Sequence, residues 1–230
     1  PGKKELDWLE TQMKSAKKYS KKVWLLLHIP PGANVFSSVS KNQYVPMWQT
    51  GYNQRFIQLI KEYSALISGG FAGHTHMDDF RVLSQVPAKA EGQTQTRAQA
   101  LSLLRICPAV SPQFGNNPGY QLFTYDRKSL SLIDYDAYWI NLEAADPATT
   151  GWQKEYRFST AYGQTEITAG TLFAVYNGLS ADPTWRGLYI NYYNVGNLSQ
   201  PVINDANFKA YVSGIGNWTE EEFKAGSGMK

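Results

Sequence analysis

The spacing of apolar positions predicts that the chain begins with a helix followed by a strand. Apolar side chains recur at helical spacing through residues 4–19, and lysines cover the opposite face. The next run, KVWLLLHI, is short and continuously apolar, and it ends at Pro30-Pro31-Gly32. Such a run is typical of a strand that is buried on both faces.

The same two patterns then repeat after a predicted loop over residues 33–50. NQRFIQLIKEYS places Phe56, Leu59, Ile60 and Tyr63 on one side of a helix, and ALISGGFAG reads as a second buried strand. A strand, a helix and a second strand predict a βαβ unit with parallel strands.

Further strands are predicted in the middle of the chain. DFRVLSQV is expected to form one strand, and the polar, Gln/Ala-rich residues 86–100 are expected to form a loop. LSLLRICPAV, YQLFTYD and LSLIDYDAYWINL follow as successive strands that are separated by turn residues. We interpret these three as an antiparallel meander.

Beyond residue 145 the pattern becomes helical. Thr165 is a candidate cap for EITAGTLFAVYNGL, and Asp182-Pro183 places a capping residue before a proline at the first helical position. Thr219 and Glu222 predict a capping box for a last short helix. We therefore expect a mixed α/β (α+β) fold, with one unit over residues 1–145 and a helical C-terminal subdomain over residues 146–230.

The only three histidines of the chain stand at the ends of the two predicted parallel strands. His28 ends the first strand, and His74 and His76 lie just past the second. Ligand sites of α/β sheets gather beyond the carboxyl ends of the strands, so this order brings three imidazoles to one place. Neutral imidazole binds zinc, iron or manganese, and we interpret His28, His74 and His76 as candidate metal ligands.

Composition narrows the classes of function. The 230 residues are 43% hydrophobic and 18% charged, as expected of a globular chain. The net charge of +3 is too small to indicate nucleic-acid binding. The lysines also cluster in the first predicted helix, where they are expected to cover its solvent-exposed face. No apolar stretch approaches the roughly 20 residues of a transmembrane helix.

Other catalytic chemistries find little support in the sequence. The serine-hydrolase motif G-x-S-x-G and the phosphate-binding motif G-x-x-x-x-G-K-[ST] do not occur. Cys107, the single cysteine, lies in an apolar strand and is interpreted as a buried, inert thiol. Asp78 and Asp79 follow the histidines closely enough to be metal ligands, but a structural role in the loop and the next strand is favoured.

Several motifs together resemble one family. GHTHMDDF resembles the C-terminal Gly-His-x-His motif of calcineurin-like metallophosphoesterases. HIPPG, paired with it, is similar to the acid sphingomyelinase and sphingomyelinase-like phosphodiesterase branch. ICPAVSPQFGNNPGYQLFTYD and YDAYWINL resemble the same branch. The resemblance extends from residue 4 to about residue 195.

The resemblance implies a metal-dependent phosphodiester hydrolase with a metallophosphoesterase β-sandwich flanked by helices. It implies two divalent metal ions, usually zinc, with His28 and His74 on one metal and His76 on the other. The expected substrate is a phospholipid headgroup or a nucleotide-like phosphodiester. The expected location is secreted, periplasmic or lysosome-like lumenal.

The N-terminal motifs of that family do not occur in this sequence. They are Asp-x-His, Gly-Asp and Gly-Asn-His-Asp/Glu, which carry the other metal ligands and the expected general acid. The chain therefore resembles the C-terminal half of the catalytic domain, and no catalytic acid is assigned within it. Two alternatives remain open: a non-catalytic half-domain that needs the N-terminal half as a partner chain, and a mononuclear three-histidine hydrolase.

Overall fold

The computed structural model describes residues 1–85, 98–144, 150–200 and 202–229, and its first part is the predicted βαβ unit. Strands β1 (Val23–Leu26) and β2 (Ile67–Ala72) pair in parallel. Helix α3 (Thr50–Tyr63) connects them and packs on α1 (Gly2–Lys18). The apolar faces of both helices share a core, which confirms the helical spacing read from the sequence.

The first sheet has the strand order β1-β2-β4-β3. β4 (Gln99–Ile106) pairs in parallel with β2, whereas β3 (Asp79–Gln85) runs antiparallel to β4. β1 is therefore an edge strand, and the Leu26 side chain is 80% exposed. The expectation that this strand is buried on both faces was wrong, because Leu25 is buried on one face whereas Leu26, which points to the other face, is exposed.

The second sheet is an antiparallel meander of β5 (Gly119–Tyr125), β6 (Leu132–Trp139) and β7 (Gln153–Arg157). The predicted meander began one strand too early, because β4 belongs to the first sheet. β7 was not predicted, since its residues QKEYR are mostly polar and exposed on this outer strand. The predicted linker over residues 145–152 lies largely outside the described residues.

Shorter helices complete the fold, and their caps can be compared with the sequence predictions. The Asp182 carboxylate caps α6, and Thr219 and Glu222 form the predicted capping box of α8. The cap of α5 is Thr168 rather than Thr165, with Thr171 completing the box. The short helices are α2 (Val35–Lys41), η1 (Ser64–Leu66), α4 (Phe158–Tyr162), α5 (Ala169–Gly178), α6 (Pro183–Tyr193), α7 (Phe208–Gly216) and α8 (Glu220–Ser227).

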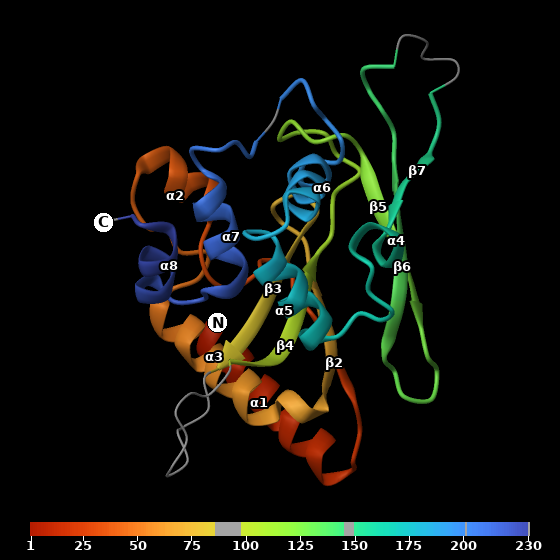
Figure 1. Ribbon diagram of the computed structural model, residues 1–230. Helices are drawn as coiled ribbons and strands as arrows, with labels where there is room; N and C mark the ends of the chain where they lie inside the picture. The colour runs from red at the N-terminus through yellow and green to blue at the C-terminus, as the bar shows by residue number, and fades with distance from the viewer. Residues whose placement is uncertain (86–97, 145–149, 201, 230) are drawn as a thin grey trace, which may run out of the picture.

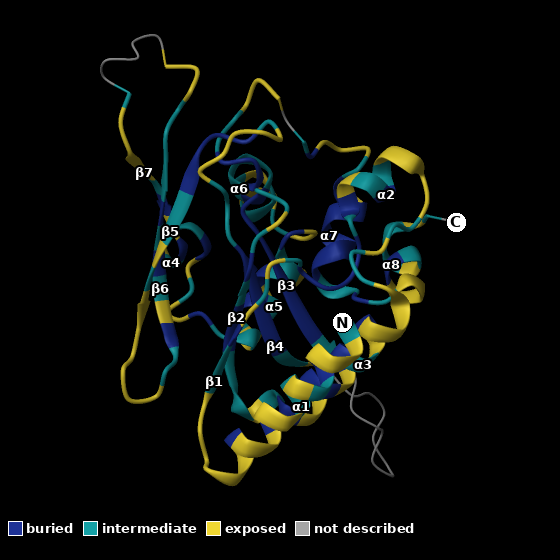
Figure 2. Ribbon diagram, turned by 180° about the vertical axis from the view of Figure 1, so that it is seen from behind, coloured by how far each residue is buried: buried dark blue, intermediate teal, exposed yellow. Residues whose placement is uncertain are grey.

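The elements form layers around the first sheet. Figure 1 shows α1 and α3 on one side of this sheet and the β5–β6–β7 sheet on the other. The two sheets approach closely at Gly69, where an added Cβ would lie 3.2 Å from the Leu132 side chain. Figure 2 shows β3 and β4 buried in the middle, with the exposed faces of α1 and α3 outside. The mixed α/β fold with C-terminal helices is thus confirmed.

The main hydrophobic core contains residues from before and after residue 145. Phe80, Val82 and Leu103 of the first sheet pack with Tyr135 of the second sheet and Leu172 of α5. The proposed division into units 1–145 and 146–230 stays a prediction. No helix in the described part of the chain is long and apolar enough to cross a membrane.

We expect Asp182→Ala to lower the free energy of unfolding by about 1 kcal/mol. The Asp182 carboxylate accepts hydrogen bonds from the backbone N–H of Thr184 (2.8 Å) and Trp185 (3.3 Å), which otherwise lack partners at the start of α6. Urea unfolding of the two proteins measures the difference. Asp182→Asn retains a capping oxygen and should stay near the wild-type value; equal losses in both variants would contradict the capping role.

Candidate functional site

His28 and His74 meet at the carboxyl ends of the two parallel strands, as the sequence predicted. Their ring centroids are 5.3 Å apart with an edge-to-face orientation. The backbone N–H of Gly73 donates to the carbonyl of His28 over 3.0 Å, which extends the β1–β2 pairing to the residue before His74. Both side chains are exposed. Two imidazoles far apart in the sequence therefore share one accessible place.

The loop that carries His74 and His76 is fixed by backbone hydrogen bonds to two other segments, the end of α6 and the stretch after β4. The N–H of Asp78 donates to the carbonyl of Tyr193 at the end of α6 (2.9 Å), and the N–H of Ala109 donates to the carbonyl of His76 (3.2 Å). The N–H of Cys107 donates to the carbonyl of Ala72 (2.8 Å). These contacts hold the loop in one conformation on the sheet end.

Both loop histidines adopt a backbone conformation that side chains other than glycine rarely take. φ is 70° at His74 and 66° at His76. A left-handed conformation of a non-glycine residue is costly and persists where surrounding structure imposes it, often at functional sites. The alternation of left-handed residues in His-x-His turns the two imidazoles in different directions from one short loop.

His76 is placed differently from the other two histidines. Its ring lies 4.7 Å from the ring of Phe114, which belongs to the loop between β4 and β5. Its Nδ1 atom is buried and has no hydrogen-bond partner among the described residues. A buried polar nitrogen without a partner is costly, and binding to another group would satisfy it.

The electrostatics at His74 favour the neutral imidazole. Burial lowers the pKa of His74, and the neighbouring His28 and His76 lower it further. Neutral imidazole is the form that binds a metal. Histidine nitrogens fit zinc and related metals, but in the part of the chain that the structure describes no group of three or more His, Cys, Asp or Glu side chains could hold an ion. The three histidines thus fit a metal only as a partial ligand set.

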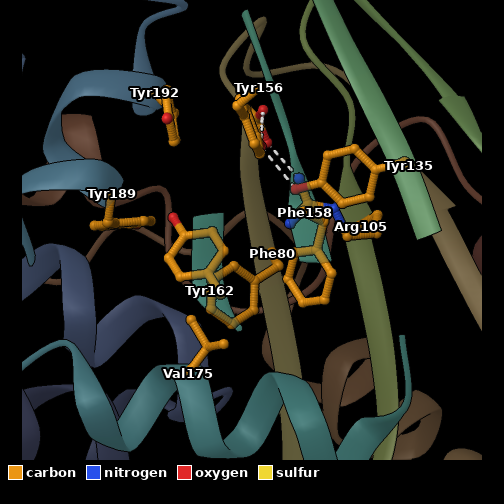
Figure 3. A pocket seen from close by; sticks show the side chains of 10 residues that line it. Phe80, Arg105, Tyr135, Tyr156, Phe158, Tyr162, Val175, Tyr189 and Tyr192 are labelled. Atoms are coloured by element: carbon orange, nitrogen blue, oxygen red, sulfur yellow. Dashed lines mark hydrogen bonds and ion pairs between the residues drawn. The ribbon is translucent and has the colours of Figure 1, made fainter. Parts of the chain in front are cut away.

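The Asp78 side chain is buried and is bound by other side chains of the protein rather than free to bind a metal ion. Its carboxylate forms an ion pair with Arg105 and accepts hydrogen bonds from Gln121 (2.8 Å) and Tyr156 (2.6 Å). The Tyr156 hydroxyl in turn lies 2.7 Å from that of Tyr135. Burial raises the pKa of Asp78 against the lowering effect of Arg105. Figure 3 shows the side chains of Arg105, Tyr135 and Tyr156 gathered close together.

Asp79 opens β3 and is also paired. It binds the Arg81 guanidinium at 2.6 Å and accepts a hydrogen bond from the Tyr189 hydroxyl at 2.9 Å. Both aspartates therefore serve the fold, as the sequence analysis favoured. Cys107 lies just past the end of β4 and is half-buried rather than fully buried, and burial raises the pKa of its thiol to about 11.

A groove of about 360 Å³ opens beside His74. Phe114 lies in its wall, so the loop over residues 111–117 reaches the site. The predicted loop over residues 86–100 lies mostly outside the described residues. β3 runs antiparallel to β4, so Gln85 at the end of β3 pairs with Gln99 at the start of β4. This pair lies at the end of the two strands that is far from the histidines.

Sequence reasoning missed the other groove residues. Phe36 and Arg81 both line the groove, but no motif marks Phe36, which lies on the unpredicted helix α2. The sequence did carry a signal for the buried roles of Arg81 and Arg105. An arginine inside an apolar strand must find a buried partner, and here the adjacent aspartates provide them.

Comparisons with known proteins place the chain in a family. The family model of the acid sphingomyelin phosphodiesterase C-terminal region matches residues 100–213. Acid sphingomyelinase-like phosphodiesterase 3b of Homo sapiens is 29% identical over 208 residues, covering 85% of this chain and 42% of that protein. This chain belongs to the acid sphingomyelinase-like branch of the metallophosphoesterases. The recognition made from the histidine motifs is confirmed.

Other members of this branch differ in the substrates that their names give. A cyclic GMP-AMP phosphodiesterase of Homo sapiens is 27% identical over 197 residues, covering 83% of this chain and 40% of the relative. Sphingomyelin phosphodiesterase of Bos taurus is 30% identical over 165 residues, covering 69% of this chain and 23% of the relative. The chain thus spans less than half of the length of these curated members of the acid sphingomyelinase-like branch.

Proposed function

We propose that this chain supplies part of the metal site of a phosphodiester hydrolase. His28 and His74 would bind one divalent metal ion and His76 a second. The observation that carries the proposal is the meeting of His28 and His74, at 5.3 Å between ring centroids, at the ends of adjacent parallel strands. The left-handed backbone of His74 and His76 and the unpartnered Nδ1 of His76 support it.

The two metal ions, zinc by family resemblance and by the nitrogen ligands, would polarise the phosphoryl group and activate water. The residues of this chain would perform the positioning. The strand ends fix His28 and His74, and the loop hydrogen bonds at Asp78 and Ala109 hold the backbone that carries His76. The groove beside His74 would orient the rest of the diester.

The substrate we propose is a phosphodiester with either a phospholipid headgroup or a nucleotide-like group. The relatives named for sphingomyelin and for cyclic GMP-AMP support these two classes. A secreted, periplasmic or lysosome-like lumenal location is expected by resemblance. A catalytic acid is expected from sequence outside this chain.

A second candidate function is a non-catalytic half-domain that needs a partner chain to build the site. Three observations favour it. The described histidines form only a partial ligand set, and both neighbouring aspartates are committed to buried arginines. In addition, β1 is an apolar edge strand with Leu26 80% exposed, on which another strand could pair.

The test uses the full-length protein that contains this chain. We expect His28→Ala to lower the hydrolysis of bis(p-nitrophenyl) phosphate by at least about 100-fold, because replacing even an outer-shell partner of a metal ligand costs 10–100-fold. Metal analysis of the same samples should show the loss of bound metal. Lys128→Ala, an exposed substitution in the turn between β5 and β6, should change neither quantity.

Full activity and unchanged metal content in His28→Ala would refute the proposed metal site. Bound metal without hydrolysis in the wild-type protein would favour the non-catalytic alternative. Hydrolysis that appears only after a second polypeptide is added would favour the half-domain that needs a partner chain.

A further inference from the structure

We propose that Phe36, Phe114 and Arg81 determine which diesters the site accepts, selecting an apolar group that carries a neutral carbonyl acceptor. This inference rests on the proposed function, because it places that group beside the phosphoryl group held at the histidines. The three residues come from three separate segments: α2, the loop between β4 and β5, and β3.

The two phenylalanines form exposed walls of the groove. Phe36 is 64% exposed and Phe114 is 53% exposed, although both rings are fully apolar. Large apolar side chains that stay exposed around a concave surface indicate a binding site. Flat rings can stack on a ligand ring or cover an acyl chain at low entropic cost, because phenylalanine has few rotamers.

The groove is continuous with the histidines. His74 lines it directly, and Phe114 touches His76 with 4.7 Å between the ring centroids. A group that fills the groove is therefore attached within reach of the metal-binding end. Met47, Met77 and Tyr193 line other parts of the wall and make the groove largely apolar. Apolar walls favour an apolar group over a second charged one.

Arg81 supplies a polar contact in these apolar surroundings. It lines the groove but is only 2% exposed, and its Nε has no hydrogen-bond partner among the described residues. A buried donor without a partner is unfavourable, and an acceptor on a ligand would relieve this. The positive charge of Arg81 is already compensated by Asp79 at 2.6 Å. The favoured acceptor is therefore a neutral carbonyl rather than another anion.

Two sources carry this chemistry. A pyrimidine base or guanine offers a flat apolar face with a ring carbonyl, and an N-acyl lipid offers an apolar chain with an amide carbonyl. Both fit a groove that Phe36, Phe114 and Arg81 line together. The experiment distinguishes the two sources.

The experiment measures dissociation constants by calorimetry on the full-length protein, with inorganic phosphate, thymidine 5′-monophosphate and short-chain ceramide 1-phosphate as probes. We expect one of the two organic phosphates to bind more tightly than inorganic phosphate. Phe36→Ser and Phe114→Ser should each weaken that ligand about tenfold, as expected for a lost stacking contact, and leave phosphate unchanged. Arg81→Lys, which keeps the charge opposite Asp79 but loses Nε, should act in the same direction.

Leu122→Ser is the matched control, because Leu122 is 55% exposed on β5 and does not line the groove. It should change no dissociation constant. Equal binding of all three probes in the wild type, or equal losses for phosphate and for the organic ligand in the Phe variants, would overturn the inference. The exposed Phe36 can be replaced without disturbing the core, so this arm remains informative if Arg81→Lys fails to fold.

Failure of the proposed function gives a different result. If inorganic phosphate does not bind the wild-type protein, the phosphoryl site fails. Binding of thymidine or short-chain ceramide without phosphate then reports on the groove alone. Loss of that binding in Phe36→Ser supports the groove, and absence of binding in the wild type refutes it.

Discussion

Replacing Asp78 with alanine should lower the free energy of unfolding by about 3–5 kcal/mol. The carboxylate is 5% exposed and pairs with the Arg105 guanidinium, which is itself 2% exposed. Removing the Asp78 carboxylate leaves the buried Arg105 cation without its partner. The Tyr156 hydroxyl, which donates to Asp78 over 2.6 Å, also loses its acceptor. Urea unfolding monitored by tryptophan fluorescence measures the loss.

Asp205→Ala provides the control for this prediction. Asp205 also pairs with an arginine, Arg186, but its side chain is 95% exposed. Because solvent screens exposed pairs, this loss should stay below about 1 kcal/mol. Similar small effects in the two variants would show that the Asp78 network does not hold the sheets together. A loss that disappears after metal removal would instead make Asp78 a metal ligand.

Replacing Glu155 with glutamine should raise the stability at pH 8 relative to the wild type by about 3 kcal/mol. Burial, together with the charge of Asp78, raises the pKa of Glu155 to about 9. The residue as a whole is half-buried, but its Oε1 atom is fully buried and has no hydrogen-bond partner among the described residues. The folded protein therefore keeps this carboxyl protonated at neutral pH.

The direction of the pH effect follows from the raised pKa. Below about pH 4.5, the ordinary value, Glu155 is protonated in both the folded and the unfolded protein. As the pH rises toward about 9, only the unfolded chain loses the proton, so stability falls through this window. Glutamine has no proton to lose in this pH range. The Glu155→Gln variant should therefore lack the part of the fall in the free energy of unfolding that Glu155 causes.

Urea unfolding at pH 5 and pH 8 measures the effect for wild type and variant. The advantage of Glu155→Gln should be small at pH 5 and large at pH 8. Glu143→Gln, an exposed substitution after β6, should follow the wild type at both values. A constant difference between Glu155→Gln and wild type across this range would show that the Glu155 carboxyl does not carry a raised pKa.

Much of the first sheet could be predicted from local pattern. The apolar runs before His28 and His74, with a helix between them, specify two parallel strands whose carboxyl ends coincide. Periodicity and strand direction are therefore enough to bring His28 and His74 together at the carboxyl ends of these strands. The resemblance to the family rested on the same motifs, and the family match over residues 100–213 is independent of them.

The second sheet could be predicted less well, because its strands carry few local signals. β7 is polar on its exposed side, and only its pairing with β6 makes it a strand. β4 resembles the strands after it in composition, but its partners β2 and β3 place it in the first sheet. The location of the groove depends on this assignment, since Phe114 follows β4.

The sequence by itself determined the βαβ unit, the helix caps at Asp182 and Thr219, and the meeting of His28 with His74. These features depend on local periodicity and on the fixed geometry of parallel strands. Only the tertiary structure decided the role of the aspartates and the position of the groove. Asp78 and Asp79 become structural because Arg105 and Arg81 are buried beside them, and no local pattern specifies which side chains will meet across two sheets.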